Sequence, residues 1–175
     1  VAQGKLCMGF LTPITNRDHR FAAMQVTNGI LGGDVTSKLF QNVREKQSLC
    51  YSIGSGYYAA KGIVLVSAGI DFDKEDHVRR EVLSQLEGCQ LGQITDEELA
   101  ASKQSLLTAL RSVQDSPSAM ENYYSAISMA QTGRSWETHM ELLAKVTKED
   151  VVACAKTLEL HSTYFLEGGD FCAAL

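Results

Sequence analysis

The stretch from Leu31 to Tyr58, LGGDVTSKLFQNVREKQSLCYSIGSGYY, contains the change of pattern around which the rest of the chain is organised. It opens with two glycines, continues with apolar residues at helical spacing, and then carries a charged turn. After residue 47 the spacing changes to period two, with aromatic and β-branched residues that favour a strand. The stretch therefore predicts a short helix over 36–46, for which Thr36 and Ser37 can provide a cap, followed by a strand over 50–58.

The junction between this helix and this strand places a cation, Arg44, near a phenol, Tyr51. Neither side chain is a strong acid or base at neutral pH, but both donate hydrogen bonds. Such donors suit holding a carbonyl oxygen or an oxyanion better than moving protons. A structural explanation is also available, because arginine complements a helix C-terminus and tyrosine favours strands. The two residue types alone favour that structural explanation.

The neighbouring segments predict a sheet. The strand over 50–58 and an apolar run over 62–70 form a hairpin, and the second arm is apolar on both faces, which indicates a position inside the sheet. Alternation predicts a first strand over 5–12, which Pro13 ends, and a final strand over 162–167. Residues 168–170, Gly-Gly-Asp, are expected to lead out of the domain.

Helical spacing and capping residues predict a set of further helices. Asn16 is positioned to cap the first of them, Thr95 and Glu98 form a capping box, and Pro117 suits a helix start. The expected ranges are 17–31, 73–91, 95–113, 120–131, 136–143 and 147–158.

Strands and helices are partly segregated along the chain, which favours an α+β fold: a mainly antiparallel sheet with helices packed on one face. A length of 175 residues with 45% hydrophobic content suffices for one domain, expected over 1–175. The chain starts at Val1 without a methionine, and we therefore expect a fragment of a longer chain.

The composition argues against several classes of partner. A net charge of −5 and a pI near 5.4 disfavour nucleic acid and anionic membranes. No run reaches the roughly 18 apolar residues of a membrane helix, and no signal-peptide pattern is present. The cysteines are odd in number and form no C-x-x-C pair, which is typical of small core residues in a reducing cytosol. They are Cys7, Cys50, Cys89, Cys154 and Cys172.

Metal, nucleophile and phosphate sites each have a weak signal. The dispersed histidines form neither His-Glu-x-x-His nor its inverse, and the His77–Glu81 pair lacks a third ligand, so a solvated helix face and no zinc site are expected. Cys50 has no histidine close in sequence and is expected to be a small core residue. The Gly32-Gly33 turn could cradle a phosphate but lacks a Walker lysine, so turn geometry is the better explanation.

The complete pattern gives a more specific signal. The glycine pair, then Ser37-x-Leu39-Phe40, Val43-Arg44-Glu45-Lys46 and Leu49-x-Tyr51-Ser52, resembles a signature of the insulinase/pitrilysin zinc peptidases, the inverzincins, which include mitochondrial processing peptidases. The match is to the second, C-terminal, non-metal domain of a half of such enzymes, of metallohydrolase-like fold. It extends more loosely over nearly all of the chain. Cys50 stands where that family often has alanine.

The resemblance implies roles for two residues. In that family the first domain binds zinc, and the second faces it across an enclosed chamber and supplies an arginine and a tyrosine. Here these positions are Arg44, expected to hold a substrate main-chain carbonyl, and Tyr51, expected to stabilise the oxyanion. The resemblance also implies that an edge strand pairs with extended substrate. Zinc is then bound by the missing N-terminal domain of the parent and not by this fragment, which alone is expected to be inactive.

Our first hypothesis is thus the substrate-binding, transition-state-stabilising domain of a cytoplasmic, bacterial zinc metalloendopeptidase. Its expected partners are a peptide substrate and a zinc-binding domain, in the same chain or in a partner subunit of a homo- or heterodimer. The alternative is a domain of a metal-free, catalytically inactive paralogue that acts as a partner or scaffold subunit. A third option is a small-molecule-binding α+β domain unrelated to proteolysis. A zinc motif in the upstream coding sequence would separate the first from the other two.

Overall fold

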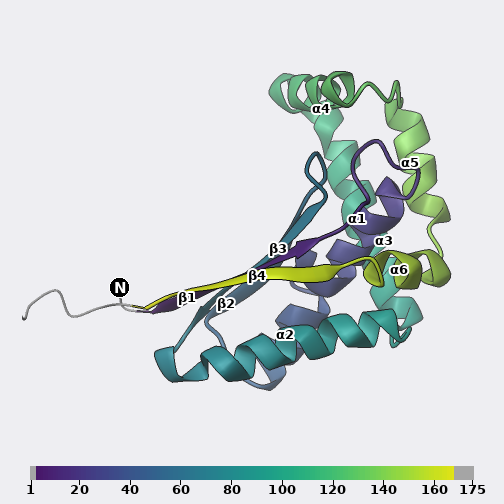
Figure 1. The fold of residues 1–175 in the computed structure, drawn as a ribbon. Coiled ribbons are helices and arrows are strands. Elements are labelled where there is room, and N and C mark those ends of the chain that lie inside the picture. Colours follow the sequence, from purple (N-terminus) through teal and green to yellow (C-terminus); the bar gives the residue numbers. More distant parts are fainter. Residues whose placement is uncertain (1–2, 168–175) are drawn as a thin grey trace, which may run out of the picture.

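The computed structural model of the protein describes residues 3–167 and contains a four-stranded antiparallel sheet (Figure 1). Helices cover one face of this sheet, which confirms the predicted α+β fold. The strand order is β2-β3-β1-β4, so β1 and β4, the first and last strands in the sequence, lie side by side. The strands are β1 (Gly4–Leu11), β2 (Ser52–Tyr58), β3 (Ile63–Ile70) and β4 (Glu159–Leu166).

Within residues 3–167 the helical elements are six α-helices and four further segments of π- or 3₁₀-helix. Of the latter, η1 and η2 are π-helical, whereas η3 and η4 are single 3₁₀ turns. In chain order the elements are α1 (Phe21–Asn28), η1 (Gly29–Gly33), η2 (Leu39–Lys46), η3 (Phe72–Lys74), α2 (Glu75–Gln90), α3 (Asp96–Ser112), η4 (Val113–Asp115), α4 (Pro117–Ala130), α5 (Trp136–Lys145) and α6 (Lys148–Ala155).

The core forms between the sheet and the helices because alternate strand residues point toward the helical layer. On β1 these residues are Leu6, Met8 and Phe10, all buried, and they belong to one hydrophobic cluster that extends to Leu158 just before β4. β3 pairs with β2 on one side and β1 on the other, which confirms the prediction that this apolar strand lies inside the sheet.

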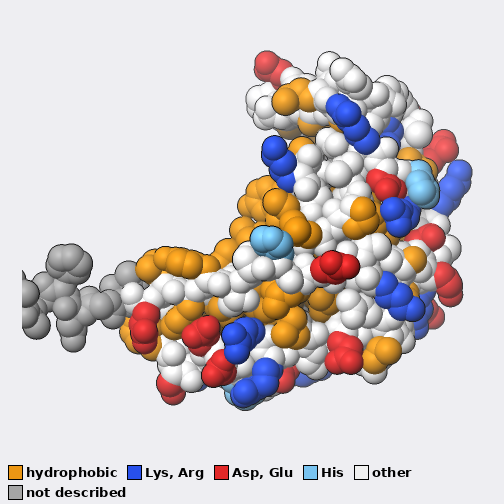
Figure 2. All heavy atoms as spheres, viewed as in Figure 1, with side chains coloured by type: hydrophobic (Ala, Val, Ile, Leu, Met, Phe, Trp, Pro, Cys, Tyr) orange, Lys and Arg blue, Asp and Glu red, His pale blue; other side chains and the backbone are white. Residues whose placement is uncertain are grey.

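The other face of the sheet has no helix over it within residues 3–167. Large hydrophobic side chains are exposed there on three strands, including Leu11 of β1, Tyr58 of β2 and Tyr164 of β4, the last with 63% of its surface accessible. Figure 2 shows hydrophobic side chains gathered along the strands.

The first helix begins later than predicted. It starts at Phe21 and not after Asn16, because Asp18 forms a local turn in which its carboxylate accepts hydrogen bonds from the backbone and guanidinium N–H groups of Arg20. Asn16 does not cap this helix; its backbone N–H donates to the carbonyl of Ala59. The predicted helix over 17–31 is therefore α1 followed by the π-helical turn η1.

Other predicted boundaries differ by a few residues. The helix expected over 36–46 is the π-helix η2, which starts at Leu39 because the Asp34 side chain accepts hydrogen bonds from the backbone N–H and hydroxyl of Thr36, and Ser37 Oγ accepts the N–H of Phe40 at 3.4 Å. The last strand begins at Glu159, three residues before the predicted start. The Thr95 capping box is present as predicted, and Thr147 caps α6 in the same way. Residues 168–170 and Cys172 lie outside the described residues.

Candidate functional site

The connection between η2 and β2 brings Arg44 and Tyr51 to the same place. η2 ends at Lys46, and Ser48 then adopts a positive φ of 51° that reverses the chain direction. The N–H of Tyr51 donates to the carbonyl of Gly69 at 2.8 Å, which attaches the returning chain to β3. The helix end and the strand start therefore form two walls of one pocket.

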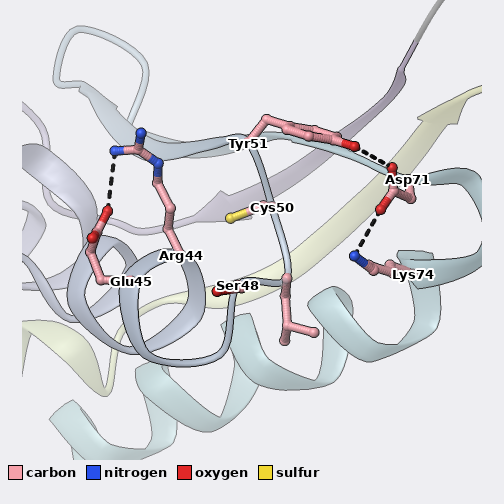
Figure 3. A pocket seen from close by; sticks show the side chains of 8 residues that line it. Arg44, Glu45, Ser48, Cys50, Tyr51, Asp71 and Lys74 are labelled. Atoms are coloured by element: carbon pink, nitrogen blue, oxygen red, sulfur yellow. Dashed lines mark hydrogen bonds and ion pairs between the residues drawn. The ribbon is translucent and has the colours of Figure 1, made fainter.

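This pocket is an open cavity of about 410 Å³ (Figure 3). The predicted donors Arg44 and Tyr51 both line it, with Cys50 between them. Asp71, just after β3, and Lys74 of η3 complete the wall beside Tyr51.

The guanidinium of Arg44 has few protein partners. Its Nη1 lies 3.5 Å from Oε1 of Glu45, the one ion pair that it forms with the described residues, and its Cζ lies 4.6 Å from the centroid of the Phe40 ring. The side chain is 38% exposed. Most of its five N–H donors are thus available to an incoming carbonyl or carboxylate.

The phenol of Tyr51 already has an acceptor. Its hydroxyl donates to Oδ1 of Asp71 at 2.7 Å, while Oδ2 of Asp71 lies 2.7 Å from Nζ of Lys74. The hydrogen bond to Asp71 raises the pKa of Tyr51. The hydrogen bond from Lys74, followed by that from Tyr51, lowers the pKa of Asp71. Tyr51 therefore keeps its proton at neutral pH, and in Figure 3 its side chain extends toward Asp71, away from Arg44.

Cys50 is not an activated nucleophile. Its side chain is partly buried, and this burial raises the pKa of the thiol to about 11. Because the thiolate is the reactive form, the cysteine is inert at neutral pH, in agreement with a packing role.

Close packing explains the glycine at position 32 without a bound phosphate. A Cβ at this position would lie 2.8 Å from the Leu39 side chain and 2.9 Å from the backbone nitrogen of Ser55. Only glycine allows η1 to approach β2 this closely. The contact between these two elements therefore accounts for Gly32, whereas a Cβ at Gly33 would meet the backbone oxygen of Asn28 at 3.3 Å.

The described residues offer no fit for a zinc ion. Residues 3–167 contain no group of three His, Cys, Asp or Glu side chains that could hold a metal. His77 lies exposed on α2, and the carboxylate of Glu81 accepts a hydrogen bond from Gln47. In the same part of the chain, no helix combines the length and apolar character needed to cross a membrane.

Sequence reasoning missed Asp71 and Lys74. They lie at the end of an apolar strand and in the turn after it, about twenty residues beyond Tyr51. The available signal was the hairpin itself: an antiparallel partner strand returns its end to the start of the first arm, so the residues after Ile70 were bound to approach Tyr51.

The sequence model described as "Peptidase M16 inactive domain" matches residues 1–106, more than half of the chain. The chain belongs to this family, which confirms the resemblance found in the sequence.

Two curated relatives support the same family. The protein is 32% identical over 168 residues to "Probable inactive metalloprotease YmfF" of Bacillus subtilis, covering 96% of this chain and 39% of that one. It is also 32% identical to an "Uncharacterized zinc protease" of Mycobacterium bovis, covering 89% of this chain and 36% of the relative. The chain thus spans about two fifths of the length of the curated relatives that it matches.

Solved structures share the fold. A conserved protein from Enterococcus faecalis superposes with a TM-score of 0.90 at 36% identity, covering 97% of this chain and 40% of that one. A structure described as the peptidase M16 inactive domain from Pseudomonas fluorescens has a TM-score of 0.81 at 24% identity, covering 94% and 40%.

Proposed function

We propose that this chain is the substrate-binding and transition-state-stabilising domain of a peptide-hydrolysing metallopeptidase. Arg44 holds a substrate main-chain carbonyl, and Tyr51 donates a hydrogen bond to the oxyanion of the tetrahedral intermediate. The observation that carries this proposal is the position of both side chains on one open pocket, where Arg44 keeps most of its donors unused.

The chemistry of the two groups suits these roles. Arginine stays charged at any working pH, so it binds a carbonyl oxygen without taking part in proton transfer. The raised pKa of Tyr51 keeps its phenol protonated, as a hydrogen-bond donor must be. When negative charge develops on the substrate oxygen, that oxygen competes with Asp71 for the proton of Tyr51.

The metal implied by the relatives' names belongs to another part of the parent in this proposal, because the described residues of this chain do not fit it. This chain contributes binding, orientation and donors. Its partners are an extended peptide, which pairs with an edge strand, and a zinc-binding domain from the same chain or from a second subunit of a cytoplasmic homo- or heterodimer.

The test uses the full-length parent with Arg44→Ala or Tyr51→Phe. Each variant is expected to lower kcat/KM for a quenched-fluorescence peptide by about 10²–10³, the usual cost of removing an oxyanion donor. Zinc content, measured by metal analysis, is expected to stay unchanged. Tyr124→Phe, a change to an exposed tyrosine of α4, away from the pocket and from both edge strands, is the matched control and leaves turnover intact. Wild-type turnover in both site variants would refute the assignment.

A second candidate function is a domain of a metal-free paralogue that serves as a partner or scaffold. The similarity to a relative named an inactive metalloprotease favours it. Metal analysis and peptide cleavage on the parent discriminate the two. One zinc per chain with chelator-sensitive cleavage supports the first function, whereas a folded, zinc-free and inactive parent supports the second.

A further inference from the structure

We propose a second binding site in this protein, between α1, α4 and α5, for a small carboxylic acid that carries one compact apolar group. The site shares no lining residue with the Arg44 pocket, so it does not depend on the proposed function. In Figure 1, α4 and α5 lie at the end of the molecule opposite α2.

The inner part of this site is an apolar cavity of about 170 Å³. Phe21 of α1 and Tyr123, Ala126 and Ile127 of α4 are among its lining residues. Pockets for drug-sized ligands measure about 300–1,000 Å³, whereas an apolar cavity of about 150 Å³ accommodates benzene. The inner cavity therefore has room for one aromatic ring or one branched aliphatic side chain.

His139 gives this cavity a rigid wall with no unsatisfied polar atom. Its Nε2 lies 2.7 Å from Oε1 of Gln25, which can only accept, so Nε2 carries the proton. Its Nδ1 accepts from the hydroxyl of Tyr123 at 3.2 Å. Phe21 and Tyr123 pack against the imidazole with ring centroids 5.4 and 6.0 Å away. With both ring nitrogens occupied, the wall offers ring surface to an apolar group.

The mouth of the site is cationic. Arg17 and Arg134 line an adjoining cavity of about 280 Å³, which shares Ala130, Thr132 and Arg134 with the inner one. The guanidinium of Arg134 lies 4.8 Å from the Phe21 ring centroid, at the boundary between the two parts. Neither arginine forms an ion pair with another residue in the described part of the chain.

The other charges near the mouth do not cancel these two cations. Asp18, beside Arg17, is engaged by Arg20 at 2.8 Å, and Glu137 is exposed on the first turn of α5. The C-terminus of α4 contributes about half a negative charge, which the N-terminus of α5 offsets. With Asp18 held by Arg20, the two arginines outnumber Glu137 and the net charge of the mouth is positive, so the mouth attracts a carboxylate and repels a cation.

Two sources can supply an apolar group joined to a carboxylate: a free small acid and the C-terminal residue of a peptide. N-acetylphenylalanine is the probe for the shared chemistry, and its amide is the neutral analogue. A pentapeptide that ends in phenylalanine with a free carboxylate tests the peptide source.

The experiment is a titration of the protein followed by ¹H–¹⁵N NMR. N-acetylphenylalanine is expected to shift the backbone amide signals of residues 16–25 and 123–139, and its neutral amide analogue is expected to bind at least tenfold more weakly. A pentapeptide that binds tighter than N-acetylphenylalanine assigns the site to peptide C-termini, and one that binds more weakly assigns it to free acids.

Two variants probe the two parts of the site. Ala126→Phe places a ring in the inner cavity from an exposed helix position, and Arg134→Gln removes a charge from the mouth. Each is expected to weaken binding at least tenfold, while Arg80→Gln, on the distant helix α2, changes nothing. Because Ala126 is exposed, its variant remains informative if loss of the Arg134–Phe21 contact impairs folding. Equal binding of acid and amide, shifts confined to residues outside 16–25 and 123–139, or no binding at 10 mM probe would each overturn the proposal.

Discussion

The hydroxyl of Tyr51 donates a 2.7 Å hydrogen bond to Asp71, so the proton that the proposed function needs is directed away from Arg44. Lys74 holds the other oxygen of Asp71 at 2.7 Å and fixes the carboxylate in place. Tyr51 lies just before β2 and Asp71 just after β3, so the hairpin brings the two residues together. A bound oxyanion must therefore compete with the carboxylate of Asp71 for the hydrogen bond from the phenol.

Weakening this acceptor is expected to favour the substrate. In the parent, Asp71→Asn keeps the shape of the side chain but replaces a charged acceptor by a neutral one, and hydrogen bonds to charged groups are roughly twice as strong. We expect kcat/KM for peptide cleavage to rise. Asp73→Asn, in the same turn but with no hydrogen bond to Tyr51, is the control. A loss of activity in Asp71→Asn alone would mean that the carboxylate positions Tyr51 for catalysis.

The hydrogen bond between Tyr51 and Asp71 also predicts how the pKa of Tyr51 responds to a substitution at Asp71. Hydrogen bonding to Asp71 raises the pKa of the phenol above its ordinary value of 10, and the charge of Asp71 acts in the same direction. Asp71→Asn is therefore expected to lower the pKa of Tyr51 toward that value. NMR titration of the tyrosine rings, with Tyr51→Phe to assign the resonance, measures this change. An unchanged pKa would show that the hydrogen bond does not persist in solution.

The lowered pKa of His139 leads us to expect a loss of folding stability in mild acid. Burial, and secondly the charge of Arg134, lower its pKa from 6.5 to about 4. The unfolded chain therefore binds a proton that the folded chain excludes, which is worth about 3 kcal/mol once the pH reaches the folded-state pKa. This stability is fully present above pH 6.5 and is lost as the pH falls toward 4.

Urea unfolding at several pH values between 7 and 4 measures this effect. His139→Gln cannot take up the proton, so the dependence on pH over this interval is expected to flatten. His77→Gln, at an exposed position of α2, is expected to retain the wild-type dependence. A wild-type slope in the His139 variant would assign the acid sensitivity to other groups.

Two glycines with similar positive φ values are expected to differ in their tolerance of alanine. Gly62 and Gly133 have φ values of +63° and +59°, so a side chain at either costs about 1–2 kcal/mol of conformational strain. At Gly62 a Cβ would also meet the backbone oxygen of Thr12, whereas at Gly133 nothing lies within 4 Å. The overlap adds about 1–3 kcal/mol.

We therefore expect Gly62→Ala to lower the free energy of unfolding by about 2–5 kcal/mol and Gly133→Ala by about 1–2 kcal/mol. Chemical denaturation of both variants gives the comparison. Equal losses would show that the turn before β3 relaxes away from Thr12.

Local patterns predicted most of the elements, and local competition explains the errors. The Thr95 capping box formed because both of its hydrogen bonds lie within four residues. The prediction failed at Asn16, where the competing Asp18–Arg20 turn is equally local but its geometry is not visible as a periodic pattern. The π-helical windings of η1 and η2 were likewise absent from the prediction, since 3.6-residue spacing does not distinguish them from α-helix over so short a length.

The sequence by itself determined the α+β class, the hairpin and the family, because hydrophobic period, turn residues and the Arg44–Tyr51 spacing are properties of neighbouring positions. The tertiary structure alone decided what surrounds these residues. Asp71 reaches Tyr51 only through the strand register, and Gln25 reaches His139 across 114 positions of sequence. Such contacts depend on how the helices pack on the sheet, and that packing is a property of the whole chain.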